Sequence, residues 1–232
     1  MVNLVYSPRW FYGVDIAIDI VSVVVLLCVA YFAFQCYQMN KGKKGHIFLS
    51  VSYVLLALSF LFKILTNFTV YYVVKEAKLV GDILLIFSQT HSSNALFFIG
   101  VVLHRLFMLF GFYLLYSLYY KKQQKSTILF MIYFIIISTL FTPLQYYLFH
   151  ITAFLFLAFL IVKYYRNCCL IQDLPSKLLL VSFTTIALSQ ILYIFVEWNQ
   201  LWYVLGEVIQ LVGYGLLLVA FLLVLHYGKK KR

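Results

Sequence analysis

Long runs of apolar residues are the feature of this sequence that most constrains its fold. A helix needs about 20 mainly apolar residues to cross the hydrocarbon core of a bilayer. Such segments lie at roughly 12–38, 46–73, 92–120, 144–166, 177–197 and 201–227, with a shorter one at 127–142. Hydrophobic residues make up 65% of the chain and charged residues 11%, too few charges to cover a water-soluble domain. We therefore predict an all-α, polytopic membrane protein in which residues 1–232 form a single seven-helix domain.

The positions of the basic residues predict which side of the membrane each end faces. Most of the 18 Lys and Arg residues stand in short runs: KGKK at 41–44, KKQQK at 121–125, the stretch 163–177, and the terminal KKKR. Basic connections remain in the cytoplasm. With seven crossings, the N-terminus is then expected outside the plasma membrane and the C-terminus inside. Because the net charge of +11 is spread over helix connections, we expect lipid and not nucleic acid as its partner.

The connection between the second and third apolar segments also carries a pattern. Val80, Ile83, Leu84 and Phe87 are spaced i, i+3, i+4 and i+7, which is typical of one face of an amphipathic helix. We predict a helix here that lies on the outer membrane interface or caps the bundle.

Two parts of the sequence resemble each other. LSVSYVLLALSFLFKI at 49–64 aligns without gaps to LLVSFTTIALSQILYI at 179–194, with seven of 16 positions identical. LFGFYLL at 109–115 then matches LVGYGLL at 211–217. These matches predict pseudo-repeats over 12–120 and 144–227, joined by a linker helix at 127–142. A shared Leu and Ser composition is the alternative explanation.

This three-plus-one-plus-three plan resembles that of the sugar-transporting SWEET proteins and, more distantly, of the microbial rhodopsins. The resemblance implies an architecture and no site residues. The Pro-Gln pair of the SWEET helices is missing, since Pro143 and Gln145 are separated and lie in the linker region. The last apolar segment contains no lysine, so a retinal Schiff base is not expected there.

Lys63 lies in the middle of the apolar stretch LALSFLFKILTNFT. A charge at that depth is unfavourable by several kcal/mol unless it is paired, hydrated or able to snorkel. Lys63 shares a helical stripe with Ser59, and the repeat places a second polar stripe opposite it. We therefore expect Lys63 to face the bundle interior and to pair with Asp19 first or Glu207 second. Snorkelling towards the outer interface is the alternative.

The ionisable residues within the apolar segments gather in their outer halves, while the inner halves are rich in Leu, Val and Phe. This asymmetry predicts a polar pocket that opens outward, although a purely structural ion-pair network would have the same composition. The candidate pocket residues are Asp15, Asp19, Lys63, His104, Arg105, His150, Tyr193, Glu197, Glu207 and Gln210.

The motifs of common enzyme classes are absent from the sequence. It contains no phosphate loop, nucleophile elbow, CxxC or HExxH pattern, so we predict no catalytic residue and no metal ligand. A sensor-like or receptor-like protein that binds a small ligand or ion is the favoured interpretation. A transporter or channel for a small solute or ion is an alternative, as is a haem or metal protein that uses His104 and His150 as axial ligands. A partner protein or a homo-oligomer also stays open.

Overall fold

The computed structural model describes residues 7–39, 45–71, 74–80, 83–89, 94–119, 125–140, 146–171 and 173–230. Within these residues the chain forms a short 3-10 helix, seven α-helices and one two-stranded hairpin. The elements are η1 (Arg9–Phe11), α1 (Val14–Met39), α2 (Gly45–Tyr71), β1 (Val74–Val80), β2 (Ile83–Gln89), α3 (Asn94–Tyr119), α4 (Lys125–Leu140), α5 (Tyr146–Ile171), α6 (Leu174–Ile194) and α7 (Leu201–Lys230). Of the described helices, six are long and apolar enough to cross a membrane. The chain is therefore a helical, multi-pass membrane protein.

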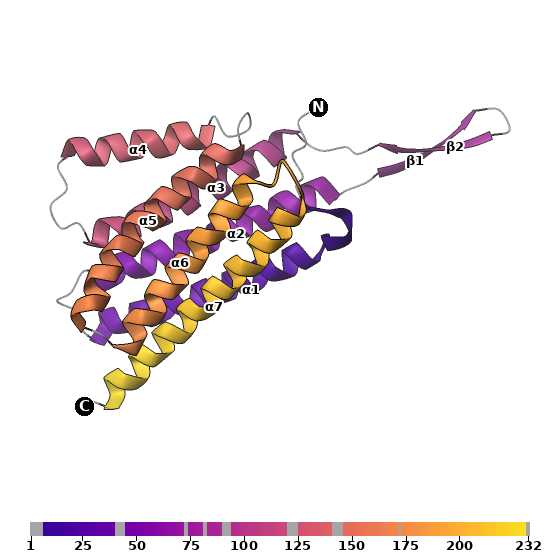
Figure 1. The fold of residues 1–232 in the computed structure, drawn as a ribbon. Coiled ribbons are helices and arrows are strands. Elements are labelled where there is room, and N and C mark those ends of the chain that lie inside the picture. The colour runs from indigo at the N-terminus through magenta and orange to yellow at the C-terminus, as the bar shows by residue number, and fades with distance from the viewer. Residues whose placement is uncertain are drawn as a thin grey trace.

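The helix α4 differs from the other six. It has 16 residues, which at 1.5 Å per residue is about 24 Å, less than the roughly 30 Å of a bilayer core. It lies along the outside of the bundle (Figure 1), against α3 and α5. Its Leu129, Phe130 and Tyr133 are exposed, as suits side chains that contact lipid. The seventh crossing remains a prediction.

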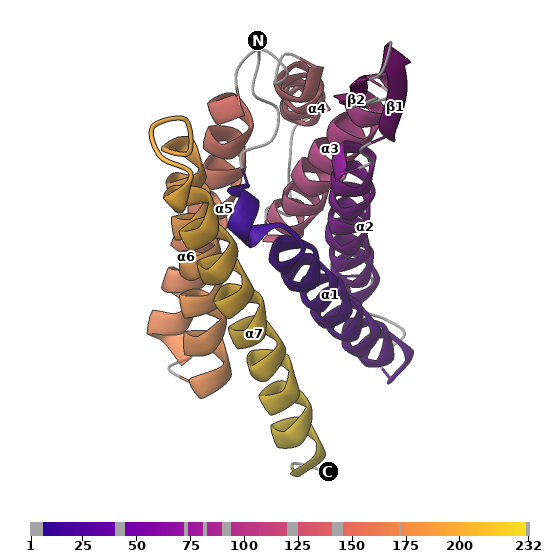
Figure 2. The same cartoon turned by 90° about the vertical axis from the view of Figure 1, so that its right-hand side faces the viewer.

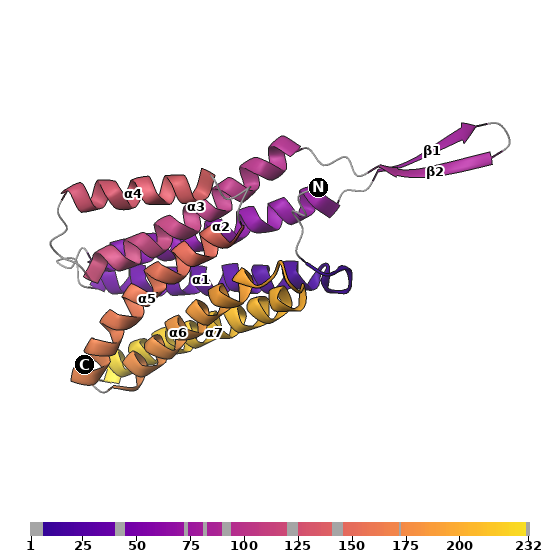
Figure 3. The same cartoon turned by 45° about the horizontal axis from the view of Figure 1, so that its top comes forward.

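The predicted interfacial helix through Val80, Ile83, Leu84 and Phe87 is wrong. Those residues belong to the antiparallel strands β1 and β2, in which Val80 is paired with Ile83. The hairpin extends away from the helices (Figures 1 and 3). Only Gly-Asp separates the two strands in the sequence, and a two-residue connection that begins with glycine favours a hairpin. That turn signal outweighs a helical pattern only one heptad long.

The six long helices form two groups of three. In one group α2 packs against α1 and α3, and in the other α6 packs against α5 and α7. The groups meet where α1 contacts α7 and where α3 contacts α5. Figure 2 shows the two groups side by side, with α1–α3 in indigo to magenta and α5–α7 in orange to yellow.

A close helix contact occurs in both groups. A Cβ atom on Gly111 of α3 would lie 3.2 Å from the backbone oxygen of Ser52 on α2. A Cβ atom on Gly213 of α7 would lie 3.4 Å from the backbone oxygen of Ser182 on α6. Glycine permits this approach because it has no side chain. The alignment of 49–64 with 179–194 and of 109–115 with 211–217 pairs Ser52 with Ser182 and Gly111 with Gly213.

The hydrophobic core lies between the two groups, and large apolar side chains also cover the outside of the bundle. Among the largest fully buried side chains are Tyr53, Leu56, Leu109, Phe183 and Tyr214. Many exposed residues are equally apolar, including Val24, Leu65, Val181, Val212 and Leu222. An apolar exterior of this extent is suited to lipid and not to water.

Candidate functional site

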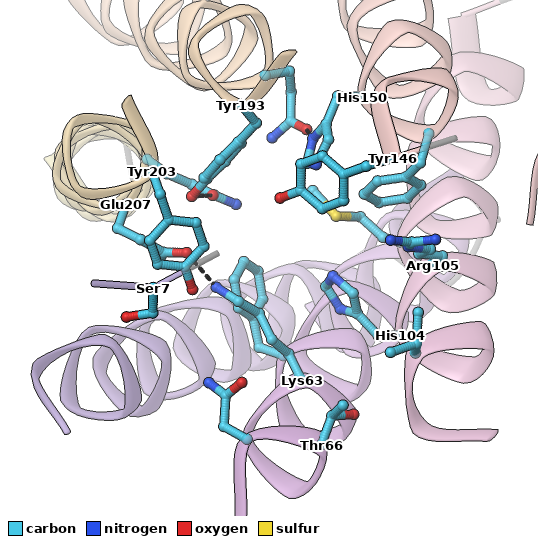
Figure 4. A pocket seen from close by; sticks show the side chains of 17 residues that line it. Ser7, Lys63, Thr66, His104, Arg105, Tyr146, His150, Tyr193, Tyr203 and Glu207 are labelled. Atoms are coloured by element: carbon cyan, nitrogen blue, oxygen red, sulfur yellow. Dashed lines mark hydrogen bonds and ion pairs between the residues drawn. The ribbon is translucent and has the colours of Figure 1, made fainter. Parts of the chain in front are cut away.

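A cavity of about 110 Å³ lies between the two helix groups. It is formed mainly by α2 and α3 on one side and by α5, α6 and α7 on the other (Figure 4). Its lining residues on α6 and α7 are those nearest the turn between these two helices. That turn lies at the opposite end of the bundle from the C-terminus (Figure 1). The structure brings seven of the ten candidate residues together around it: Lys63, His104, Arg105, His150, Tyr193, Glu207 and Gln210.

The predicted ion pair of Lys63 is present, and it involves both acids at once. The Lys63 Nζ donates to Asp19 Oδ1 at 2.8 Å and to Glu207 Oε1 at 2.5 Å. The Lys63 side chain is 16% exposed, and those of Asp19 and Glu207 are 0% and 1% exposed. Its ammonium also lies 5.6 Å from the ring centre of Phe60 and 5.9 Å from that of Tyr203. Lys63 therefore joins α1, α2 and α7 inside the bundle and does not snorkel.

His104 presents a hydrogen-bond acceptor to the cavity. Its Nδ1 lies 2.9 Å from the hydroxyl and 2.9 Å from the backbone carbonyl oxygen of Ser59. A carbonyl oxygen accepts only, so Nδ1 carries the hydrogen and donates it. In the neutral imidazole, Nε2 is then the acceptor. The ring extends from α3 towards the space between the groups (Figure 4).

His150 presents a second acceptor. Its Nδ1 lies 2.9 Å from Oε1 of Gln190, whose amide nitrogen is 3.4 Å from the hydroxyl of Ser189. Nδ1 therefore donates to the amide oxygen, and Nε2 is the acceptor of the neutral ring. His150 is 5% exposed, and its Nε2 has no hydrogen-bond partner among the described residues. An unsatisfied buried acceptor costs about 1–3 kcal/mol.

Arg105 and Tyr193 belong to contacts between helices. The guanidinium carbon of Arg105 lies 5.6 Å from the ring centre of Tyr146 and 5.5 Å from that of Phe149, so cation–π interactions join α3 to α5. The Tyr193 hydroxyl donates to Gln210 Oε1 at 2.8 Å, which joins α6 to α7. Both contacts anchor polar side chains at the cavity wall.

Three candidate residues do not line the cavity. Asp19 is fully buried and accepts a hydrogen bond from Lys63, which does line the cavity. Asp15 accepts hydrogen bonds at 2.9 Å from the backbone nitrogens of Gly13 and Ile16, so it caps the first turn of α1. Glu197 is exposed in the turn after α6. The prediction that Glu197 faces the pocket is wrong because α6 ends at Ile194, before the predicted stripe reaches it.

Several lining residues were not predicted. Tyr146 and Tyr203 line the cavity and stand four residues before His150 and Glu207. That spacing places them on the same helix faces, so helical periodicity was sufficient to find them. Ser7 also lines the cavity, but it precedes the first helix and no periodic pattern includes it.

The residues and the size of the cavity are poorly suited to a metal ion or a haem. Within the described part of the chain, no three His, Cys, Asp or Glu side chains are grouped so as to hold a metal ion. A cavity of about 110 Å³ is well below the roughly 300–1,000 Å³ of pockets for drug-sized ligands. A haem held between His104 and His150 would require the helices to move apart.

Comparisons of the chain with models of protein families, with curated proteins and with solved structures gave no match. Its function is therefore inferred from the cavity, because function resides in sites and not in folds.

Proposed function

We propose that this chain is a non-enzymatic, sensor-like membrane protein that binds a small neutral molecule carrying hydrogen-bond donors. The Nε2 of His150 carries the proposal, because it is a buried acceptor that no described residue satisfies. Because that atom is itself buried, a ligand N–H or O–H group in the cavity reaches it when a neighbouring side chain of the wall moves aside, and the Nε2 of His104 offers a second acceptor.

The charges around the cavity favour a neutral ligand. Lys63 is already bound by Asp19 and Glu207, and the guanidinium of Arg105 is held against two aromatic rings. An anion or a cation would have to compete with these contacts, whereas a neutral donor would not. The cavity of about 110 Å³ is somewhat smaller than the roughly 150 Å³ cavity that binds benzene in another protein. A ligand of six to seven non-hydrogen atoms is therefore about the upper limit.

The rest of the bundle supports binding more than conduction. Tyr53, Leu56 and Leu109 are fully buried in the core, and on α2 the first two precede Lys63 by seven to ten residues, which is about 10–15 Å. A solute in the cavity thus meets packed apolar side chains on that side. With the N-terminus outside and the C-terminus inside, as the basic residues predict, the cavity belongs to the outer half of the bundle and the apolar core to the inner half.

The binding experiment compares phenol with benzene. Both are close to the upper size limit of the cavity, but only phenol has a donor. Phenol should raise the thermal unfolding temperature of the purified protein more than benzene does, with an affinity about tenfold higher for one satisfied acceptor. The matched variant is His150→Asn, whose amide nitrogen replaces the donor to Gln190 and which lacks Nε2. Equal effects of phenol and benzene, or an unchanged phenol effect in His150→Asn, would contradict the proposal.

Transport is the second candidate, and the arrangement of the helices favours it. The cavity lies between the two helix groups, and the same glycine contact occurs in each. If 12–120 and 144–227 are pseudo-repeats, rocking of one group against the other provides alternating access. Uptake of radiolabelled glycerol by proteoliposomes tests this candidate. We expect uptake equal to that of empty vesicles, and protein-dependent uptake that His150→Asn abolishes would favour transport.

A further inference from the structure

Two carboxyl groups share a single ammonium group inside the bundle. Asp19 and Glu207 are 0% and 1% exposed, and both bind the Nζ of Lys63. If both acids were ionised, one negative charge would remain without compensation. Such a charge is strongly unfavourable away from water, and carboxylates that share one site do not ionise together readily.

We propose that Asp19 is a proton-binding site, which holds a proton on Oδ2 and so leaves the cluster of Asp19, Lys63 and Glu207 neutral. The Oδ2 atom is buried and has no hydrogen-bond partner in the described part of the chain, which suits a protonated oxygen better than a charged one. The Oδ1 atom still accepts from Lys63. This proposal does not depend on any ligand in the cavity.

The two acids differ in ways that place the proton on Asp19. The bond from Lys63 to Glu207 is the shorter one, 2.5 Å against 2.8 Å, and hydrogen bonds between two ionised groups are the shorter ones. Glu207 also lines the cavity, whereas Asp19 is fully buried behind Lys63. Glu207 is therefore the ionised partner of Lys63, and Asp19 is its neutral partner.

The other groups around Asp19 do not supply the missing positive charge. The titratable side chains that interact electrostatically with Asp19 are Asp15 on α1, Lys63 on α2, Tyr193 on α6, and Tyr203, Glu207 and Tyr214 on α7. Lys63 alone among these is positive. The nearby Asp15 adds a further acid, which makes an ionised Asp19 still less favourable.

The position of this proton gives it a structural role. Asp19 lies where α1 contacts both α2 and α7, which is one of the two junctions between the helix groups. Release of the proton would leave an excess negative charge at that junction. Protonation of Asp19 therefore determines the charge of the contact that joins the two groups.

Infrared spectroscopy of the protein in lipid nanodiscs at pH 7 tests the site. Asp19 should contribute the carbonyl stretch of a protonated carboxylic acid, and this band should shift when the protein contains aspartate labelled with ¹³C at the side-chain carboxyl. The band should disappear in Asp19→Asn and persist in Asp15→Asn. In Lys63→Met a second protonated carboxyl band should appear, since Glu207 loses its cation.

Three results would overturn the proposal: no protonated carboxyl band, a band that the aspartate label does not shift, or a band that persists in Asp19→Asn. An unshifted band would place the proton on Glu207. If Asp19→Asn does not fold, the labelled wild type and Asp15→Asn still decide between an aspartate and a glutamate and between the two neighbouring aspartates.

Discussion

Replacing Lys63 by methionine removes the cation that joins α1, α2 and α7 but keeps an apolar stem of similar length. The lysine makes two charge-assisted hydrogen bonds, each contributing roughly 1.5–3 kcal/mol. Loss of one partner of a buried ion pair costs about 3–5 kcal/mol. Because a stranded carboxylate can take up a proton, we expect Lys63→Met to lower the free energy of unfolding by about 3 kcal/mol, the lower end of that range.

Double variants identify which of the two acids, Asp19 or Glu207, is the ionised partner of Lys63. Lys63→Met together with Glu207→Gln should recover part of the loss, with a coupling energy of about 1.5 kcal/mol or more. The coupling with Asp19→Asn should be smaller, since the asparagine resembles a neutral Asp19. The assay is detergent-induced unfolding in bicelles, followed by tryptophan fluorescence.

A matched control is Lys177→Met, which changes an exposed lysine in the first turn of α6. It should alter the free energy of unfolding by no more than about 0.5 kcal/mol. Strictly additive effects of Lys63→Met and Glu207→Gln would refute the account of Lys63 as an internal, paired cation. They would instead agree with a lysine whose ammonium reaches the interface.

Further substitutions test the helix contacts and the cavity wall. Gly213→Ala places a Cβ atom 2.6 Å from Ile186 Cγ1 and should reduce stability by about 1–3 kcal/mol in the same unfolding assay. Gly215→Ala meets nothing within 4 Å and should be neutral or stabilising by up to about 1 kcal/mol; equal losses in both variants would contradict the close contact. Asp15→Ala should reduce stability by about 0.5–2 kcal/mol through loss of the α1 cap, and Asp15→Asn, which keeps the accepting oxygen, should lose less. Gly206→Ala, whose Cβ would lie 2.7 Å from the Tyr193 ring, should weaken the thermal stabilisation by phenol because it displaces that ring from the cavity wall.

The membrane class and the pairing of Lys63 with an acid could both be predicted from the sequence. Both follow from the high free-energy cost of placing a charge in hydrocarbon. A lysine within the hydrocarbon is stabilised by an acid at a similar depth in the membrane, and Asp19 and Glu207 are the acids at about the depth of Lys63. The prediction for Glu197 is wrong because α6 ends at Ile194, three residues earlier. Hydrophobic periodicity does not determine where a helix ends to within a turn.

The hairpin and the position of Ser7 could not be predicted from the spacing of apolar residues. A single heptad pattern around Ile83 predicts a helix, whereas the Gly81-Asp82 dipeptide is a turn signal. Ser7 reaches the cavity wall by a tertiary contact of a segment that has no repeating pattern. The Nε2 of His150 has no partner among the described residues because Nδ1 is the atom that faces Gln190, and only three-dimensional packing determines which nitrogen does so.

The accessibility of a cysteine in the cavity tests most directly the claim that a membrane-embedded pocket opens on the outer side. Val101 lines the cavity and is partly exposed, so Val101→Cys is introduced into a variant whose four native cysteines are replaced by serine. A small, membrane-impermeant thiosulfonate added outside intact cells should modify this cysteine, and phenol should slow the reaction. Ser182→Cys, which lies in the buried contact between α6 and α7, should not react from either side. Modification of the Val101→Cys variant only from the cytoplasmic side, or not at all, would contradict an outward-opening cavity.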